Sequence, residues 1–202
     1  SKFNSYLFDN EKNEEIHELV GNKDDIKNMF EDAKSSNHKH GCRHFIFASK
    51  EDLTKEQALK VASDICKEYR QDLNSCVLIN HKKHRNNDNA DKNHYHLILK
   101  NTDEKTGKTY DFSFSHKRNE KLSRMSEIDF GHSLTKGRHN KAVYFALLKD
   151  EKNELAEKMK HLKKDDLPNS KFSSKSLQKA NKNGVDKAKE TQVVKAIWKQ
   201  SD

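Results

Sequence analysis

The segment HYHLILK at residues 94–100 constrains the fold more than any other part of the chain. It is short, mostly apolar and rich in branched side chains, which is typical of a buried β-strand. Side chains two residues apart on a strand point to the same face of the sheet. The segment therefore predicts a strand that carries His94 and His96 on one face and Tyr95 on the other.

Other segments predict partners for this strand. Residues 42–49 and 75–81 are rich in aromatic and branched residues, and each predicts a strand. Aromatic residues alternate along residues 109–114, which follow the polar turn 102–108. We therefore expect residues 109–114 to form a hairpin with the strand at 94–100.

Helices are predicted where apolar residues recur at intervals of three and four. This spacing occurs in residues 22–35, after Thr54, and in residues 116–130. Thr54 and Gln57 have the capping-box pattern of a helix start. Because a tight turn joins the last two strands, an antiparallel arrangement is favoured over a parallel one. We predict an α+β fold: a central, mainly antiparallel sheet with the His-x-His strand in the middle and helices packed on one face.

The C-terminal quarter differs in composition. Residues 140–162 predict one long helix, apolar at first and increasingly charged, and Pro168 is the only proline of the chain. Residues 173–200 predict a lysine-rich helix. Residues 151–202 hold 13 Lys/Arg against 8 Asp/Glu. We expect the functional domain at residues 1–150 and a basic, helical tail or linker at residues 151–202.

Charge and cysteine content narrow the function classes. The net charge is +8, which favours polyanionic partners, nucleic acid first and acidic membrane second.

The three cysteines, Cys42, Cys66 and Cys76, form no CxxC pair, so we expect reduced, mostly buried thiols in a cytosolic protein. No apolar run reaches the roughly 18 residues of a membrane span, and no apolar leader is visible.

The histidine pair predicts a metal site if a third ligand lies nearby. His81 ends the preceding predicted strand, and His84 follows three residues later, so either imidazole could complete the set. Three imidazoles would leave coordination positions open for a phosphate, as a catalytic metal requires. Two carboxylates of the following loop, Asp88 and Asp91, could accept a hydrogen bond from a ligand imidazole and so orient it.

The residues alone leave other interpretations open. A His-x-His pair on a strand is common without a metal, and the loop carboxylates could simply be solvated. Imidazole ligands suit zinc, iron, copper or nickel, and this chemistry by itself favours zinc or manganese. Five basic residues could line a DNA path through phosphate contacts or could belong to ordinary charged surfaces: Arg118, Arg124, Lys136, Arg138 and Lys141.

Taken together, the motifs resemble the relaxase, or mobilisation nuclease, domain of conjugative and mobilisable elements. This MobA/VirD-like domain is a branch of the His-hydrophobic-His (HUH) endonucleases. The resemblance covers roughly residues 4–148 and rests on the order and spacing of five stretches: NSYLFDNEKNEEIHELVG (4–21), GCRHFIFAS (41–49), VLINHKKHR (77–85), DKNHYHLIL (91–99) and SFSHKRNEKLSRMSEIDFGHSLTKGRHNKAV (113–143).

The resemblance implies a mechanism. Tyr6 would be the nucleophile that attacks a DNA phosphate, leaving a 5′-phosphotyrosine link and a free 3′-hydroxyl. The metal, magnesium or manganese in this family, would be held by His81, His94 and His96. Among the other tyrosines, Tyr95 points away from the histidines, and three lie on apolar stripes that predict core positions: Tyr69, Tyr110 and Tyr144.

The same resemblance implies partners and a location. The substrate would be single-stranded or hairpin DNA at a transfer origin. Accessory relaxosome proteins and a type IV secretion coupling protein would assist, without a membrane partner. We expect a bacterial cytoplasmic enzyme that could be translocated with the DNA. Two alternatives stay open: a non-catalytic origin-binding protein on the same fold, and a metal-dependent phosphodiesterase in which water replaces tyrosine.

Overall fold

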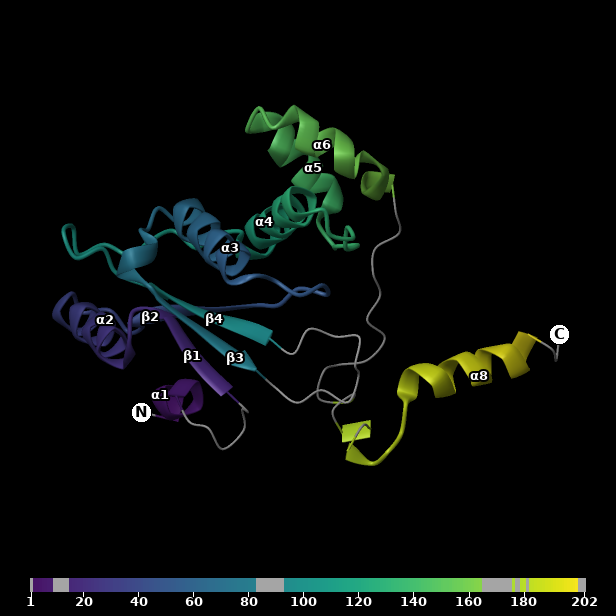
Figure 1. Cartoon of the computed structure of the whole chain (residues 1–202), viewed down its shortest axis with the longest axis horizontal. Helices are drawn as coiled ribbons and strands as arrows, with labels where there is room; N and C mark the ends of the chain where they lie inside the picture. Colours follow the sequence, from purple (N-terminus) through teal and green to yellow (C-terminus); the bar gives the residue numbers. More distant parts are fainter. Residues whose placement is uncertain are drawn as a thin grey trace. The chain divides into compact units, whose positions relative to one another are not determined.

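A four-stranded sheet forms the centre of the fold in the computed structural model, which describes residues 2–8, 15–82, 93–164, 176, 179–180 and 182–199. All the strand pairs are antiparallel. Their spatial order is β1 (Glu15–Val20), β3 (Val77–Lys82), β4 (Asn93–Lys100) and β2 (Cys42–Phe47) (Figure 1).

Strand β4 lies inside the sheet, between β3 and β2, as predicted for the His-x-His strand. Its residues from His94 to Leu99 are all buried. In the register of β3 and β4, His81 lies opposite His94 and Ile79 lies opposite His96. The α+β fold with a central antiparallel sheet is thus confirmed.

Helices cover both faces of the sheet, so the prediction of helices on one face is wrong. The apolar side chains of the central strands supply both cores, because they alternate between the two faces. On one face, α1 (Lys2–Phe8) and α2 (Lys23–Ser35) pack through Leu7, Ile26 and Met29. On the other face lie α3 (Lys55–Glu68), which begins at the predicted Thr54–Gln57 capping box, and α4 (Ser115–Phe130) (Figure 1).

The second core also contains two of the cysteines. Cys66 at the end of α3 and Cys76 after the short 3-10 helix η2 (Leu73–Ser75) are buried in it. Cys42 is partly exposed, and all three cysteines are free thiols, as predicted. They contribute to packing as small apolar side chains.

The predicted strand at residues 109–114 is absent. One isolated bridge joins Thr102 to Thr109, and residues 110–114 form no strand. The reason is that both edges of β4 are already paired, with β3 and with β2, so no hydrogen-bonding edge is left for a hairpin partner. Phe114, expected inside that strand, is 80% exposed and has a positive φ of 54°.

Strand β1 was not predicted from the pattern. Its sequence, EIHELV, carries charged residues and shows an irregular burial pattern. Among the described residues it pairs with β3 alone, and Ile16 lies opposite His81. An edge strand with few buried positions needs few apolar residues, so local periodicity gives little signal for it.

The predicted long helix over residues 140–162 is broken into α5 (Asn140–Lys149), α6 (Asn153–Met159) and the 3-10 helix η3 (Lys160–Lys164). Glu151 adopts the left-handed conformation, with a φ of 59°, and this ends the first helix. The break lets Met159 of α6 pack against Leu147 of α5 in a third core. Burial of these apolar side chains outweighs the continuity of one helix.

Contacts divide the chain into a unit Ser1–Asp165 and a second unit Asp166–Asp202. In the second unit, α8 (Lys187–Lys199) is shorter than the predicted helix at 173–200 and is preceded by Gly184, whose φ is 70°. Pro168 lies outside the described residues. No helix in the described ranges combines the length and apolar character that crossing a membrane requires. The functional boundary at residue 150 stays a prediction.

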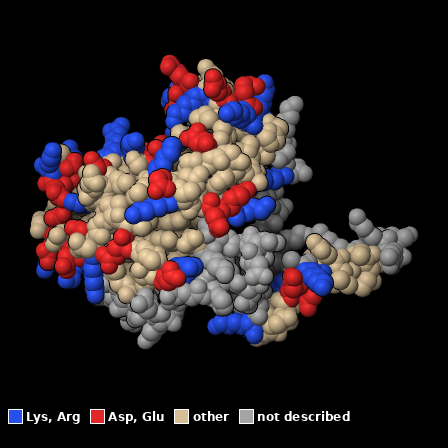
Figure 2. All heavy atoms as spheres, in the orientation of Figure 1, with Lys and Arg blue, Asp and Glu red and all other residues tan. Residues whose placement is uncertain are grey.

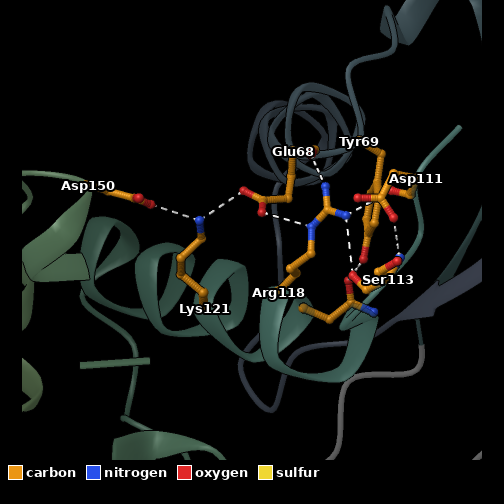
Figure 3. A network of polar contacts seen from close by, with 8 residues as sticks. Glu68, Tyr69, Asp111, Ser113, Arg118, Lys121 and Asp150 are labelled. Atoms are coloured by element: carbon orange, nitrogen blue, oxygen red, sulfur yellow. Dashed lines mark hydrogen bonds and ion pairs between the residues drawn. The ribbon is translucent and has the colours of Figure 1, made fainter. Parts of the chain in front are cut away.

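A polar network holds α4 against the end of α3 (Figure 3). The Arg118 guanidinium donates from Nε to Glu68 Oε1 at 3.0 Å and from Nη1 to the Asp111 carbonyl at 2.8 Å. It also lies 4.0 Å from the centre of the Tyr69 ring. Lys121 joins the other Glu68 carboxylate oxygen at 3.0 Å. Arg118 therefore ties helix ends and a loop together through several directed bonds.

We expect Arg118→Ala to lower the free energy of unfolding by about 2–3 kcal/mol, since it leaves the partly buried Glu68 carboxylate and three carbonyls without this donor. Urea denaturation followed by circular dichroism measures the loss. Arg138→Ala is the matched control, because Arg138 is exposed and should change stability by less than about 0.5 kcal/mol. Equal stability of both variants would contradict a structural role for Arg118.

Candidate metal centre

Three histidines meet on the face of the sheet that α1 and α2 cover. His81, His94 and His96 are all buried, and one ring nitrogen of each lies within 4.8 Å of the others. The ring centres of His81 and His96 are 4.3 Å apart, those of His94 and His96 are 4.8 Å apart, and those of His81 and His94 are 5.2 Å apart. The cluster brings together the predicted pair and His81 as the third member.

Strand geometry produces this cluster. His94 and His96 share a face because they are two residues apart, and His81 joins them because it pairs directly with His94. Tyr95 points to the opposite face, where its ring stacks on that of Phe47 with the centres 5.0 Å apart. The alternation predicted from the sequence is therefore confirmed.

The arrangement fits a divalent cation. Nitrogen atoms bound to one ion at about 2.1 Å each can be at most about 4.2 Å apart, so small side-chain rotations would close the set. His81 Nε2 donates to the carbonyl oxygen of Leu7 at 2.7 Å, which would leave coordination to its Nδ1. These donors are imidazoles only, and they do not distinguish among the metals that accept nitrogen ligands.

A fourth histidine, His44 on β2, supports the cluster from outside and was not predicted. Its Nε2 lies 2.7 Å from Nδ1 of His96, and the two rings are stacked with centres 5.0 Å apart. Burial, assisted by the nearby His81, lowers the pKa of His44. A neutral His44 can accept the Nδ1 proton of His96 and so direct Nε2 of His96 toward an ion.

We expect His44→Ala to weaken Mn²⁺ binding by about 10- to 100-fold, the usual effect of losing a partner that orients a ligand. Isothermal titration calorimetry on the purified chain measures this affinity. His44→Gln should recover part of it, because its amide oxygen can accept the same hydrogen bond. His17→Ala, at an exposed position of β1, is the control. Wild-type affinity in His44→Ala would contradict the orienting role.

Tyr6 lies on α1 beside the cluster. Its ring centre is 5.7 Å from that of His96 and 6.4 Å from that of His81, and the side chain is 44% exposed. The neighbouring Leu7 is fully buried in the core, and its carbonyl accepts the His81 hydrogen bond. Leu7 thus anchors α1 through its side chain and its backbone, which fixes an accessible phenol next to two imidazoles.

The other tyrosines occupy different places. Tyr69, Tyr95 and Tyr144 are buried, while Tyr110 is only half-buried and lines a surface hollow, so it is not the core residue that its stripe predicted. Three other predicted site residues lie outside the described residues: His84, Asp88 and Asp91.

The predicted basic residues fall into two groups. Arg118 and Arg124 are engaged within the protein: Arg118 in the network with Glu68, and Arg124, 3% exposed, with Glu127 at 2.6 Å and with the Thr135 carbonyl. The remaining three have exposed side chains around the start of α5: Lys136, Arg138 and Lys141.

A surface hollow that contains two cations lies beside His44. It has a volume of about 850 Å³ and is lined by His44 together with His38, Lys39, His40 and Arg43. Half-buried aromatic rings of Tyr110 and Phe112 form part of the same wall, and Arg43 lies over the Phe112 ring. On the face shown in Figure 2, cationic and anionic side chains are interspersed. On this face, a polyanion would therefore meet local groups of cations rather than a surface of one charge.

A cluster of three buried histidines on adjacent central strands, with an exposed phenol beside it, could hold a metal ion. The family model of the relaxase, MobA/VirD2-like, nuclease domain matches residues 6–132, well over half of the chain, and the chain belongs to this family. The matched range includes Tyr6 and the three clustered histidines. Comparisons with curated proteins and with solved structures gave no match.

Membership of this family supports a role as a relaxase nuclease.

Proposed function

We propose that this domain nicks single-stranded DNA at one site of a transfer origin, and that it does so by tyrosine transesterification through Tyr6. The observation that carries this proposal is the exposed Tyr6 phenol held beside His81 and His96. A buried tyrosine could not reach a phosphate, and a distant tyrosine could not attack the phosphate that the metal centre binds. The purpose of the reaction would be to start mobilisation of a plasmid or conjugative element.

The proposed reaction is a phosphoryl transfer in which one bond to phosphorus forms as another breaks. The Tyr6 oxygen attacks the scissile phosphorus and loses its proton, while the bond from phosphorus to the 3′-oxygen breaks. The leaving 3′-oxygen takes up a proton, and the 5′-phosphate stays attached to Tyr6. A phenolate is also a competent leaving group, so the reverse reaction can rejoin the strand.

We propose His81, His94 and His96 as the ligands of Mg²⁺ or Mn²⁺. When bound, the ion supplies positive charge that polarises the scissile phosphate. The chain itself positions the reactants: Leu7 anchors the helix that carries Tyr6, and His44 orients His96. His84, Asp88 and Asp91 remain proposed alternatives or outer partners of the metal on the basis of sequence.

DNA contacts are proposed for two sets of exposed cations. Lys39 and Arg43 in the hollow beside His44 can bind phosphates, and Tyr110 offers a ring surface on which an unstacked base can lie. A second set lies around the start of α5 and comprises Lys136, Arg138 and Lys141. Arg118 and Arg124 are not assigned to phosphates, because their guanidinium groups are already used within the fold.

Partners beyond DNA are proposed from the family resemblance: accessory relaxosome proteins, a type IV secretion coupling protein and, for the tail, non-specific DNA affinity or a link to further domains. The proposed location is the bacterial cytoplasm, with translocation alongside the DNA.

The test is adduct formation. The full chain is incubated with Mn²⁺ and labelled single-stranded oligonucleotides tiled across the DNA that flanks its gene, and the products are separated under denaturing conditions. We expect one oligonucleotide to give a slow, boiling-resistant protein–DNA band. Cleavage without such a band would replace the proposal with hydrolysis by water. Binding without cleavage or band would indicate a non-catalytic origin-binding protein.

A further inference from the structure

A second, smaller pocket lies on the sheet face opposite the metal centre. It has a volume of about 300 Å³ and lies among β2, α3, α4 and the loop after α4. Its apolar lining includes Phe45, Val61 and Leu122. This volume is at the small end of the range for small-molecule sites, which suits one planar group rather than a protein segment.

The polar wall of this pocket contains Arg124, a cation that is 3% exposed. Its Nη1 donates to the Thr135 carbonyl and its Nη2 to Glu127. Its Nε is buried and has no hydrogen-bond partner among the residues that the structure describes. Arg124 therefore places a buried positive charge, with one donor that the described residues leave unused, in the wall of the pocket.

Strand β2 connects the pocket to the metal centre. It is the edge strand next to β4, and Ile46 lies opposite His96 in the register. Ile46 is 57% exposed and also lines the pocket. A polymer that ran from the histidine cluster over the edge of β2 would meet the rim of the pocket.

We infer that this pocket receives one nucleobase of the single-stranded DNA, and that it contributes to the choice of the nick site. The apolar lining packs against the base, and Arg124 in the pocket wall supplies positive charge beside a ring nitrogen or an exocyclic oxygen of that base. Reading a base removed from its stack by packing and edge hydrogen bonds gives sequence preference. The inference rests on the proposed function, because it takes the DNA strand as the ligand.

The test uses abasic scanning with the full chain in EDTA, so that no cleavage occurs. The probe is the oligonucleotide that forms the adduct or, if none does, the tiled oligonucleotide that binds most tightly. Each position in turn is replaced by an abasic unit, and affinities are measured by fluorescence anisotropy. Ser126 lines the pocket on α4, so Ser126→Phe fills it and Ser126→Ala is the matched control.

In the wild type, we expect one abasic position to weaken binding about 10-fold. In Ser126→Phe that position should lose its effect, while the intact oligonucleotide binds about 10-fold more weakly, and Ser126→Ala should behave as the wild type. Identical profiles for the wild type and a folded Ser126→Phe, or a wild-type profile without a sensitive position, would overturn the inference. If circular dichroism shows that Ser126→Phe is unfolded, Val61→Phe fills the same pocket and takes its place.

Adduct formation by the wild type distinguishes failure of the base pocket from failure of the tyrosine chemistry. An adduct with identical profiles would refute the base pocket alone. A pocket-dependent profile without an adduct would refute the tyrosine chemistry and leave the pocket as a binding site. Absence of binding to all oligonucleotides would overturn both.

Discussion

Replacing Tyr6 with phenylalanine is expected to reduce adduct formation at least about 10⁴-fold, to background, because the substitution removes only the attacking oxygen. The ring that packs beside His81 and His96 is kept, so the position of α1 should not change. DNA binding and Mn²⁺ binding should stay within about threefold of the wild type, since no proposed phosphate or metal contact is lost. Denaturing gels measure the adduct, and anisotropy and calorimetry measure the two affinities.

Tyr144→Phe is the matched control for this experiment. Tyr144 is buried on α5 in the third core, away from the histidine cluster, and its variant should form the adduct at the wild-type rate. An adduct that persists in Tyr6→Phe would mean that another residue is the nucleophile. Unchanged cleavage without an adduct would assign the attack to water.

The second large effect is expected from the metal ligands. His96→Ala should lower the rate of adduct formation about 10³-fold and remove the rise in melting temperature that Mn²⁺ gives the wild type, because one of three proposed ligands is lost. Differential scanning fluorimetry with and without Mn²⁺ measures this rise. Its loss is specific to ligand removal, whereas a fall in the metal-free melting temperature would report only on packing.

His161→Ala controls for the loss of a histidine as such, since His161 is exposed in η3 and should leave both the rate and the Mn²⁺ effect unchanged. If His96→Ala kept the Mn²⁺-dependent rise and near wild-type activity, the cluster would not be the metal centre. The Arg118 variant tests the packing of α4, and the His44 variant tests the orientation of His96.

Local patterns were sufficient for the elements that surround the site. The strands at 42–49, 75–81 and 94–100 and the helices at 22–35 and 116–130 were predicted to within a few residues. The shared face of His94 and His96 was also predictable, because the two-residue repeat of a strand is fixed by its backbone. His81 became a candidate through its place at a strand end, and the register with His94 then brought it to the pair.

The tertiary structure decided how these elements share the sheet. The pairing of β4 on both edges excluded the expected hairpin, and burial on both faces placed helices on either side. The hydrogen bond between His44 and His96 depends on the pairing of β2 with β4, which no local repeat encodes. The left-handed residue Glu151 likewise ended a helix whose sequence period continued.

The availability of charged side chains also depends on the tertiary structure. Arg118 and Arg124 were predicted from the sequence as possible DNA contacts, because a sequence shows which residues are charged but not which partners they contact. In the fold, Glu68 and Glu127 lie close enough to take up these guanidinium groups. A backbone repeat is set within a few neighbouring residues and can be read from them, whereas strand register, face and ion pairing are set by contacts between distant segments, so they exist only once the chain has packed.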